Sequence, residues 1–221
     1  MIDFSILFED GEALVIDKPA GLPLDRPRAG GVSLEDHLDA LRFGFQREPF
    51  PVHRLDRDTS GCLLLARNPK ALKRFSAAFE AREVEKVYLG VVAAEVEGDS
   101  GTIELSLTKI SSAEKGWRMI PAKKGKPAVT HWKVVSRKPG MTLVEFRPET
   151  GRTHQIRVHA LAGLGAALLG DPIYGDGKGA PRTMLHAAAL TVTRGEKPPI
   201  AATAPLPIDF AMLGFEDLSE R

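Results

Sequence analysis

The chain has 221 residues, with 30 lysines and arginines against 29 aspartates and glutamates, and a formal net charge of +1. This balance excludes a strongly basic, histone-like nucleic-acid binder. Apolar residues make up 43% of the chain and charged residues 27%, as in a globular protein with a full core. There is one cysteine, Cys62, and no apolar run approaches the roughly 18 residues of a membrane span, so we expect a cytoplasmic, reduced protein.

The charges are segregated along the chain. Residues 1–12 carry a net charge of −4 and residues 209–221 a net charge of −3, whereas residues 52–74 carry +4 and residues 109–133 carry +6. The ends are therefore acidic and the interior segments basic. A basic run is by default a solvated face of the fold.

The first predicted element is a hairpin, because the apolar segments FSILF and ALVID flank the turn sequence Glu9-Asp10-Gly11. A loop rich in proline and glycine follows. Ser33 and Asp36 then form a capping-box pattern ahead of leucines at helical spacing, which predicts a helix that ends near Gly44.

The next two elements are a strand and a helix. Residues 62–66 form a short apolar run between Gly61 and Asn68, which predicts a buried strand. Asn68 and Pro69 suit the cap and first position of a helix in which Leu72, Phe75 and Phe79 face inward.

Alternation of apolar and polar residues predicts a series of strands in the second half. In residues 84–92, Val87, Leu89 and Val91 lie on one face while Lys86 and Tyr88 lie on the other. The same alternation recurs around residues 103–107, 130–134 and 144–146, and the polar stretch 109–127 predicts an exposed basic loop or hairpin. These elements predict an α+β fold with a largely antiparallel sheet and a few helices, in one compact domain over residues 1–221.

The segment PVHRLDRDTSGCLLLARN, residues 51–68, is the first that could carry chemistry. Asp56 lies between Arg54, Arg57 and Asp58, directly before the apolar strand. Neighbouring cations favour an ionised carboxylate, as a nucleophile or base requires. The alternative is that Asp56 or Asp58 caps a turn, and local physics alone weighs the two about equally.

The segment ETGRTHQIRVHA, residues 149–160, predicts a helix capped by Thr153, with His154, Arg157, Val158 and Leu161 along one side. Arg157 would then be available to a carboxylate elsewhere. His154 and His159 are five residues apart, unlike helical zinc ligands, so we expect no metal site.

The glycine-rich segment LGDPIYGDGKGAP, residues 169–181, matches neither phosphate-binding glycine motif and predicts a tight loop. His186, beside an apolar strand, is interpreted as a hydrogen-bonded histidine of the core. Ser60 lacks the glycine pattern of a nucleophile elbow, and Cys62 is interpreted as a small buried residue.

Taken together and in order, several motifs resemble those of the RluA family of pseudouridine synthases. They are DKPAGLP at residues 17–23, HRLDRDTSG at 53–61, KVYLG at 86–90, GRTHQIRVH at 151–159, GDPIYG at 170–175 and LHAAAL at 185–190. The resemblance runs from Ile6 to about Leu206. It implies a mixed sheet with a catalytic cleft across it, and it places the family's essential aspartate at Asp56, its tyrosine at Tyr88 and its arginine at Arg157.

The resemblance implies isomerisation of uridine to pseudouridine in a structured tRNA or rRNA, with no metal or other cofactor. Asp56 would attack the ribose or remove a proton from it, and both routes stay open. Arg157 would orient that carboxylate in a salt bridge, and Tyr88 would stack on the uracil. After base flipping, Arg54 would fill the vacated space. The other residues expected to bind substrate are His53, Arg57, Lys86, Arg152, His154 and Gln155.

Many relatives carry an S4-type RNA-binding module ahead of the catalytic region, which here starts almost at Met1. We therefore expect recognition of RNA by a monomeric catalytic domain alone, without a protein partner, and we assign the basic segments to the RNA phosphates. Two alternatives are a non-catalytic RNA-binding protein of the same fold and a hydrolase that uses Asp56, His154 or His186.

Overall fold

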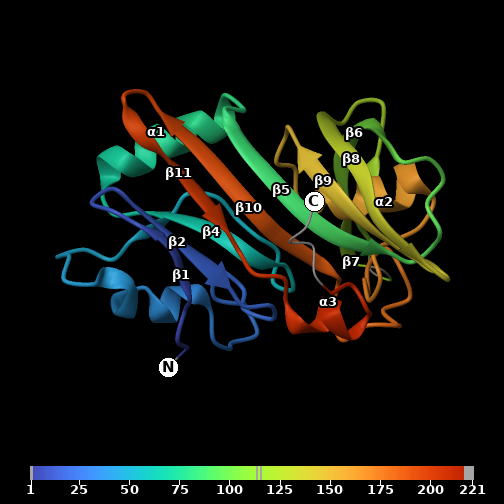
Figure 1. Cartoon of the computed structure of the whole chain (residues 1–221), viewed down its shortest axis with the longest axis horizontal. Coiled ribbons are helices and arrows are strands. Elements are labelled where there is room, and N and C mark those ends of the chain that lie inside the picture. The colour runs from blue at the N-terminus through green and yellow to red at the C-terminus, as the bar shows by residue number, and fades with distance from the viewer. Residues whose placement is uncertain (1, 113, 115, 217–221) are drawn as a thin grey trace. The chain divides into compact units, whose positions relative to one another are not determined.

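The computed structural model describes residues 2–112, 114 and 116–216, and the chain divides into two compact units (Figure 1). Unit 1 consists of residues 1–86 and 186–205, and unit 2 of residues 87–185 and 206–221. The chain passes from one unit to the other within two strands and once in a connecting segment. The prediction of a single domain stays a prediction.

Unit 1 is built on a mixed sheet. The strand order is β1-β2-β4-β10, with β11 paired to β10 and β3 paired to β4. Strands β4 and β10 run parallel, and the other pairs are antiparallel. The bounds are β1 (Ile6–Glu9), β2 (Ala13–Lys18), β3 (Phe50–Pro51), β4 (Ser60–Ala66), β10 (Leu185–Arg194) and β11 (Lys197–Thr203). The predicted hairpin and the predicted strand at 62–66 are confirmed.

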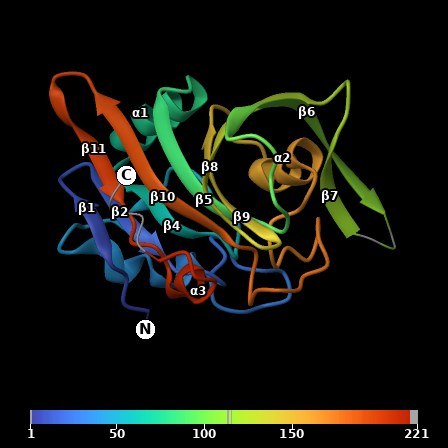
Figure 2. The same ribbon diagram turned by 45° about the vertical axis from the view of Figure 1, so that its right-hand side comes forward.

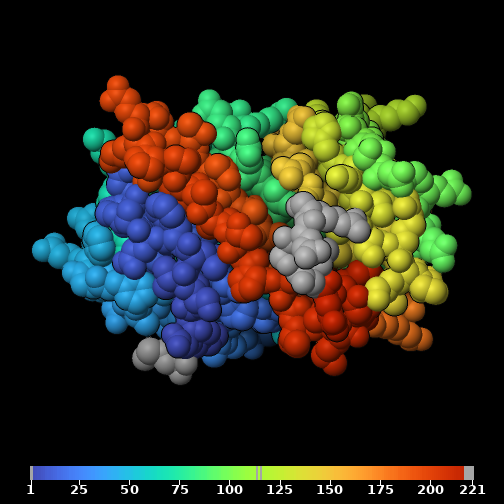
Figure 3. Space-filling view, in the orientation of Figure 1, coloured from blue at the N-terminus to red at the C-terminus, as the bar shows by residue number. Residues whose placement is uncertain are grey.

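The core of unit 1 follows from the apolar runs in β2 and β4. Leu14 pairs with Leu65 and Ile16 with Leu63, and all four side chains are fully buried. In the space-filling view of Figure 3, the side chains of β1 (blue) lie against those of β11 (orange-red), in agreement with the contacts between these strands. Burial on this scale is the main favourable contribution to folding of the unit.

The helix predicted after Asn68 is confirmed as α1 (Pro69–Glu80). The Asn68 side chain accepts a hydrogen bond from the backbone N–H of Ala71 at 2.9 Å, and Pro69 occupies the first turn, where its missing N–H costs nothing. Phe75 is buried, as predicted.

The segment after Ser33 differs from the prediction. Its capping box with Asp36 is present, but the chain forms two short 3-10 helices, η1 (Leu34–His37) and η2 (Asp39–Arg42), instead of one α-helix. Leucines three and four residues apart suit either helix type, so their spacing does not separate the two. The second helix ends at Phe43, whose backbone is left-handed.

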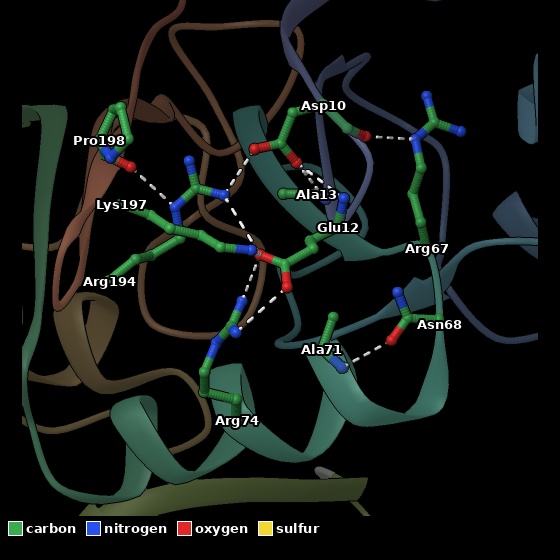
Figure 4. Close-up of polar contacts among 10 residues, drawn as sticks. All are labelled: Asp10, Glu12, Ala13, Arg67, Asn68, Ala71, Arg74, Arg194, Lys197 and Pro198. Carbon is green, nitrogen blue, oxygen red and sulfur yellow. Dashed lines mark hydrogen bonds and ion pairs between the residues drawn. The ribbon is translucent and has the colours of Figure 1, made fainter.

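A network of charged side chains joins the β1–β2 turn of unit 1 to three other elements (Figure 4). Asp10 and Glu12 lie in the β1–β2 turn, where an Asp10 oxygen accepts the backbone N–H groups of Glu12 and Ala13. Glu12 contacts Arg74 of α1 at 2.7 Å and Lys197 of β11 at 3.0 Å, and Asp10 contacts Arg194 of β10 at 2.5 Å. The hydrogen bonds of Arg74 and Lys197 lower the pKa of Glu12 to about 2.

Replacement of Glu12 by glutamine is expected to lower the free energy of unfolding by about 1 kcal/mol at neutral pH, since two cations lose their carboxylate partner. Because the pKa of Glu12 is lowered on folding, its stabilisation is present above the ordinary carboxyl pKa and is lost as the pH falls toward 2. Urea unfolding from pH 7 down to pH 2 measures both effects. Glu196→Gln, at an exposed carboxylate of the β10–β11 turn, is the control. A loss of stability equal to that of this control would contradict the prediction.

Unit 2 is an antiparallel sheet in the order β5-β9-β8-β6-β7. Figure 2 shows β6 and β7 as a hairpin beside α2, so the predicted basic hairpin is confirmed, apart from residues 113 and 115, which lie outside the described residues. The bounds are β5 (Val84–Val92), β6 (Ser100–Ser112), β7 (Gly116–Pro121), β8 (Lys126–Lys138), β9 (Met141–Pro148), α2 (Gln155–Leu164) and α3 (Ile208–Met212).

The core of unit 2 lies between this sheet and α2. Phe146 of β9, Ile156 and Ala160 of α2 and Leu168 share one buried cluster. At Gly163, a side-chain β-carbon would come within 2.7 Å of Ile103 on β6, so glycine allows the helix to lie close to the strand. Antiparallel strand pairs and a few helices confirm the predicted α+β class. None of the helices among the described residues has the length and apolar character needed to cross a membrane.

Candidate active site

Asp56 lies in a tight turn of unit 1 that leads into β4. The backbone N–H of Thr59 donates to the Asp56 carbonyl at 3.1 Å, and the preceding Leu55 is buried. The side chain of Asp56 is partly exposed. The turn is therefore anchored on both sides while its carboxylate stays within reach of solvent.

A buried lysine ties this turn to the DKPAGLP loop. Lys18 is fully buried, and its ammonium donates to the backbone carbonyls of Pro19, Leu22 and Arg57 at 2.8, 2.9 and 3.0 Å. Three N–H donors meet three acceptors, which offsets much of the cost of burying the charge. Gly21 and Arg57 add a second tie, because each donates to the backbone carbonyl of the other. The residue after Asp56 is thus fixed through its own carbonyl.

Replacement of Lys18 by methionine is expected to lower the free energy of unfolding by about 2–4 kcal/mol, because the carbonyls of Leu22 and Arg57 lose their buried donor. Lys70→Met, at an exposed position of α1, is the matched control and should change stability by less than about 0.5 kcal/mol. Urea denaturation of the three proteins measures the effect. Equal midpoints for Lys18→Met and Lys70→Met would show that the buried ammonium does not hold the loop.

The TSG sequence after the turn joins β4 to β10. Gly61 has a positive φ of 105°, and a β-carbon there would lie 2.2 Å from the Ala187 carbonyl oxygen, so only glycine fits. Ser60 contacts His186 Nδ1 at 2.9 Å, and both are buried, which confirms His186 as a hydrogen-bonded histidine of the core. Cys62 is buried as predicted, and burial raises the pKa of its thiol to about 12, so it is not a nucleophile at neutral pH.

Two further candidates in unit 1 lie beside Phe79 of α1. The His53 ring stacks on Phe79 with centroids 4.7 Å apart, and its Nε2 accepts the backbone N–H of Leu64 at 3.0 Å. Burial, with Lys86 nearby, lowers the pKa of His53 to about 3, so this ring is neutral at physiological pH. The Lys86 ammonium lies 5.8 Å from the Phe79 ring, and burial lowers the pKa of Lys86 too. Arg54 and Arg57 are exposed on the surface.

In unit 2, the start of α2 differs from the prediction. The helix begins at Gln155, and its cap is His154 in a left-handed conformation with φ of 53°, not Thr153. His154 therefore does not share a helix face with Arg157. A left-handed backbone conformation is uncommon for a residue other than glycine, and such residues are concentrated at functional sites.

Gln155 takes the place of a capping side chain. Its Oε1 accepts from the Arg152 backbone N–H and the Thr150 hydroxyl, while its Nε2 donates to the Val129 carbonyl and the Thr130 hydroxyl. The residue is buried, and these four bonds use its whole hydrogen-bonding capacity. Gln155 therefore positions the helix start and the backbone of Arg152.

Arg157 forms a buried ion pair with Asp171. Its Nε and Nη2 donate to the two carboxylate oxygens at 2.7 and 2.8 Å. Asp171 also accepts the backbone N–H groups of Ile173 and Tyr174 at 2.9 and 3.1 Å. Burial works to raise the pKa of Asp171, but the hydrogen bonds and charge of Arg157 hold it below its ordinary value. The pair fixes the guanidinium plane and binds the GDPIYG loop to α2.

The two tyrosines of the chain, Tyr88 and Tyr174, both lie in unit 2. The Tyr174 ring lies 5.1 Å from the Arg157 guanidinium, and its hydroxyl lies 3.0 Å from Nδ1 of His154. Tyr88 lies on β5 opposite Phe146 of β9, half-buried against the core of the unit. Arg152 donates to the Pro127 carbonyl at 3.1 Å.

The structure groups the predicted site residues by unit. Unit 1 holds His53, Arg54, Asp56, Arg57 and Lys86, and unit 2 holds Tyr88, Arg152, His154, Gln155 and Arg157. In the part of the chain that the structure describes, no three His, Cys, Asp or Glu side chains are grouped so as to hold a metal ion.

Sequence reasoning missed Lys18, Asp171 and Tyr174. Each stands in a motif that the sequence does display, DKPAGLP or GDPIYG, so membership of a motif was the available signal. Lys18 is 39 residues from its partner Arg57 in the sequence, and Asp171 is 14 residues from Arg157. No local pattern identifies pairs that are so far apart.

Known proteins match this chain over most of its length. A family model described as RNA pseudouridylate synthase matches residues 12–162. An uncharacterized RNA pseudouridine synthase of Zymomonas mobilis is 55% identical over 212 residues, which cover 95% of this chain and 97% of that protein. Ribosomal large subunit pseudouridine synthase D of the same organism is 34% identical over 201 residues, which cover 86% of this chain and 61% of that protein.

A solved structure shows the same fold. Human RNA pseudouridylate synthase domain containing 4 superposes with a TM-score of 0.79 at 26% sequence identity, over 94% of this chain and 90% of that chain. The similarity covers both units and confirms the predicted fold class.

Proposed function

The chain belongs to the RNA pseudouridylate synthase family, and on that premise we propose that it isomerises specific uridines in a structured tRNA or rRNA with Asp56 as the essential carboxylate. An RNA pseudouridine synthase is an isomerase, and this class of activity follows from the family. The proposal adds the residues, their roles and the kind of RNA, with the chain acting as a monomer without a protein partner.

The reaction is balanced without any added group. The bond between uracil N1 and ribose C1′ breaks, the base turns, and C5 forms a new bond to C1′. The C5 proton leaves and N1 gains a proton, so there is no net oxidation or reduction. Asp56 starts this sequence either by attack on C1′ or by removal of a proton from the sugar.

The observation that carries the assignment of Asp56 is its anchored turn. Lys18 binds the carbonyl of Arg57, the residue that follows Asp56, and Gly21 and Arg57 bind each other's carbonyls. A carboxylate that must meet one sugar carbon gains rate from such fixed placement. An aspartate that merely capped a surface turn would not need a buried ammonium beneath its loop.

Arg157 is the proposed cation that orients the Asp56 carboxylate. Its Nε and Nη2 donate to Asp171, and this bidentate contact holds the guanidinium in one plane. Tyr88 is the proposed aromatic partner of the uracil ring and assists the late loss of the C5 proton. Its half-buried position on β5 suits a ring that must present one face.

RNA binding is proposed for the exposed Arg54 and Arg57 and for the half-buried Arg152. Arg54 fills the space of the flipped uridine, and Arg57 and Arg152 contact phosphates, with the basic hairpin of β6 and β7 as a further grip. His53, which is neutral, and Gln155, whose hydrogen bonds are all used, enter the proposal as residues that position the site. Lys86, partly buried, and His154 are proposed near the substrate.

The test uses RNA labelled with tritium at uridine C5. Formation of the C5–C1′ bond releases that label to water. Unmodified tRNA and rRNA transcripts are incubated separately with the protein in the presence of a metal chelator. We expect release from at least one of the two pools. Binding of RNA without release from either pool would support the non-catalytic alternative instead.

A further inference from the structure

An exposed tryptophan stands on the basic hairpin of unit 2. Trp117 lies on β7, and 43% of the residue is exposed. Its indole ring stacks on the imidazole of His154 with centroids 4.8 Å apart and an interplanar angle of 29°. The Lys109 ammonium of β6 lies 4.9 Å from the centre of the same ring. A large aromatic surface is thus held in place and open to solvent beside a cation.

Hydrogen bonds of Tyr174 hold the surroundings of the Trp117 ring in place. The Tyr174 hydroxyl accepts the backbone N–H of Met119, two residues after Trp117, and it also contacts His154 Nδ1. These contacts join β7 to the start of α2 and to the GDPIYG loop. An exposed side chain on a hairpin would otherwise be free to change rotamer, so this support gives Trp117 a defined position.

The position is close to the residues of the proposed reaction. Trp117 contacts His154, His154 contacts Tyr174, and the Tyr174 ring lies 5.1 Å from the Arg157 guanidinium. An RNA strand whose uridine reaches Arg157 therefore brings its neighbouring nucleotides toward this ring. Residues 109–133 carry a net charge of +6, which attracts phosphates and disfavours a cationic or purely apolar protein partner.

We propose that Trp117 stacks on a nucleobase of the substrate RNA outside the uridine pocket, while Lys109 binds an adjacent phosphate. Rings presented next to cations are how proteins bind unpaired bases, because every base has a π face. When the base arrives, the Lys109 ammonium leaves the ring for the phosphate. This inference rests on the proposed function for its RNA substrate, and it adds a second point of contact with that RNA.

Fluorescence tests the stacking directly. The chain has two tryptophans, and Trp132 packs against the core of unit 2, so Trp132→Phe leaves Trp117 as the sole reporter. The probes are an oligouridylate about twelve nucleotides long and inorganic polyphosphate of equal charge, both at low salt. We expect quenching by oligouridylate and none by polyphosphate, since only the first offers a base. Absence of quenching at saturating oligouridylate would overturn the proposal.

Affinities separate stacking from a structural role of the same ring. Trp117→Ala is expected to bind oligouridylate about 10-fold more weakly and polyphosphate with unchanged affinity, whereas Trp117→Phe retains most of the binding. Lys109→Gln is expected to weaken both probes. If Trp117→Ala weakened both probes equally, its ring would act only as support for His154, and the proposal would be wrong.

The same proteins keep the two proposals apart. If the wild-type protein released no tritium from any RNA but oligouridylate still quenched Trp117, the isomerase mechanism would be wrong and the stacking of Trp117 on a base would be supported. If tritium release were normal and Trp117→Ala matched the wild type in its affinity for oligouridylate and in its rate of tritium release, the stacking of Trp117 on a base would be wrong and the isomerase mechanism would be supported.

Discussion

Replacement of Asp56 by asparagine is expected to reduce pseudouridine formation at least about a thousandfold, because the amide neither attacks the ribose nor accepts a proton from it. The two side chains have nearly the same shape, and the ties of Lys18 go to backbone carbonyls, so the turn keeps its structure. We therefore expect RNA affinity within about threefold of the wild type. Single-turnover assays and filter binding measure the two quantities.

Asp58→Asn is the matched control, since it removes a carboxylate two residues along the same turn, about 3.9 Å from Arg57. It should keep the wild-type rate within a small factor. Equal rates for Asp56→Asn and the wild type would remove Asp56 from the mechanism. If Asp56→Asn and Asp58→Asn lost the same fraction of the rate, the cause would be the reduced negative charge of the turn and not a specific role of Asp56.

Replacement of Asp171 by alanine is expected to lower the free energy of unfolding by about 3–5 kcal/mol, because Arg157 then stays buried without its carboxylate partner. The backbone N–H groups of Ile173 and Tyr174 lose their acceptor as well. In the protein that still folds, the loosened guanidinium should reduce the isomerisation rate at least about 10-fold. Urea denaturation and single-turnover rates at low temperature measure these effects.

The acid side of the stability profile gives a second readout for this pair. The pKa of Asp171 is held below its ordinary value in the folded protein, so its stabilisation is present above the ordinary carboxyl pKa and is lost as the pH falls through the folded pKa. Asp171→Asn, which preserves the shape, should lack that loss.

Asp176 provides the control in the same loop. Its carboxylate is exposed and accepts the backbone N–H of Lys178, so Asp176→Ala should change stability by less than about 1 kcal/mol. If Asp171→Ala and Asp171→Asn both unfolded at the wild-type urea concentration, the buried pair would not hold the loop to α2.

Local signals predicted much of the fold. The β1–β2 hairpin follows from two apolar runs around an acidic turn, and α1 from Asn68 and Pro69 at its start. Strand β5 has the predicted bounds, Val84–Val92. In each case the pattern and the element occupy the same short segment.

Features set by distant partners were not predictable. The resemblance to the RluA family implied a salt bridge between Arg157 and Asp56, whereas no local pattern identifies Asp171 as the partner of Arg157. Likewise, the general preference for threonine at helix caps placed the cap at Thr153. The cap is His154 instead, in a left-handed conformation that contacts of Gln155 and Tyr174 stabilise. In the sequence, Lys18 has the appearance of an ordinary charged residue at the end of a strand, and nothing local shows that its ammonium is buried.

The structure also changes how a motif is interpreted. Within HRLDRDTSG, and likewise within GRTHQIRVH, residues that are neighbours in the sequence differ in role. His53, Gly61 and Gln155 hold backbone in place, whereas Asp56 is partly exposed. A motif therefore marks a piece of structure in which few side chains are available for chemistry.

Pseudouridine mapping in total cellular RNA tests the central claim most directly. RNA is compared from cells with the gene, without it, and with the gene restored as wild type or as Asp56→Asn. We predict that pseudouridine at one or a few structured sites is lost with the gene, returns with the wild-type protein and does not return with Asp56→Asn. An identical pseudouridine map with and without the gene, or full restoration by Asp56→Asn, would contradict an Asp56-dependent uridine isomerase.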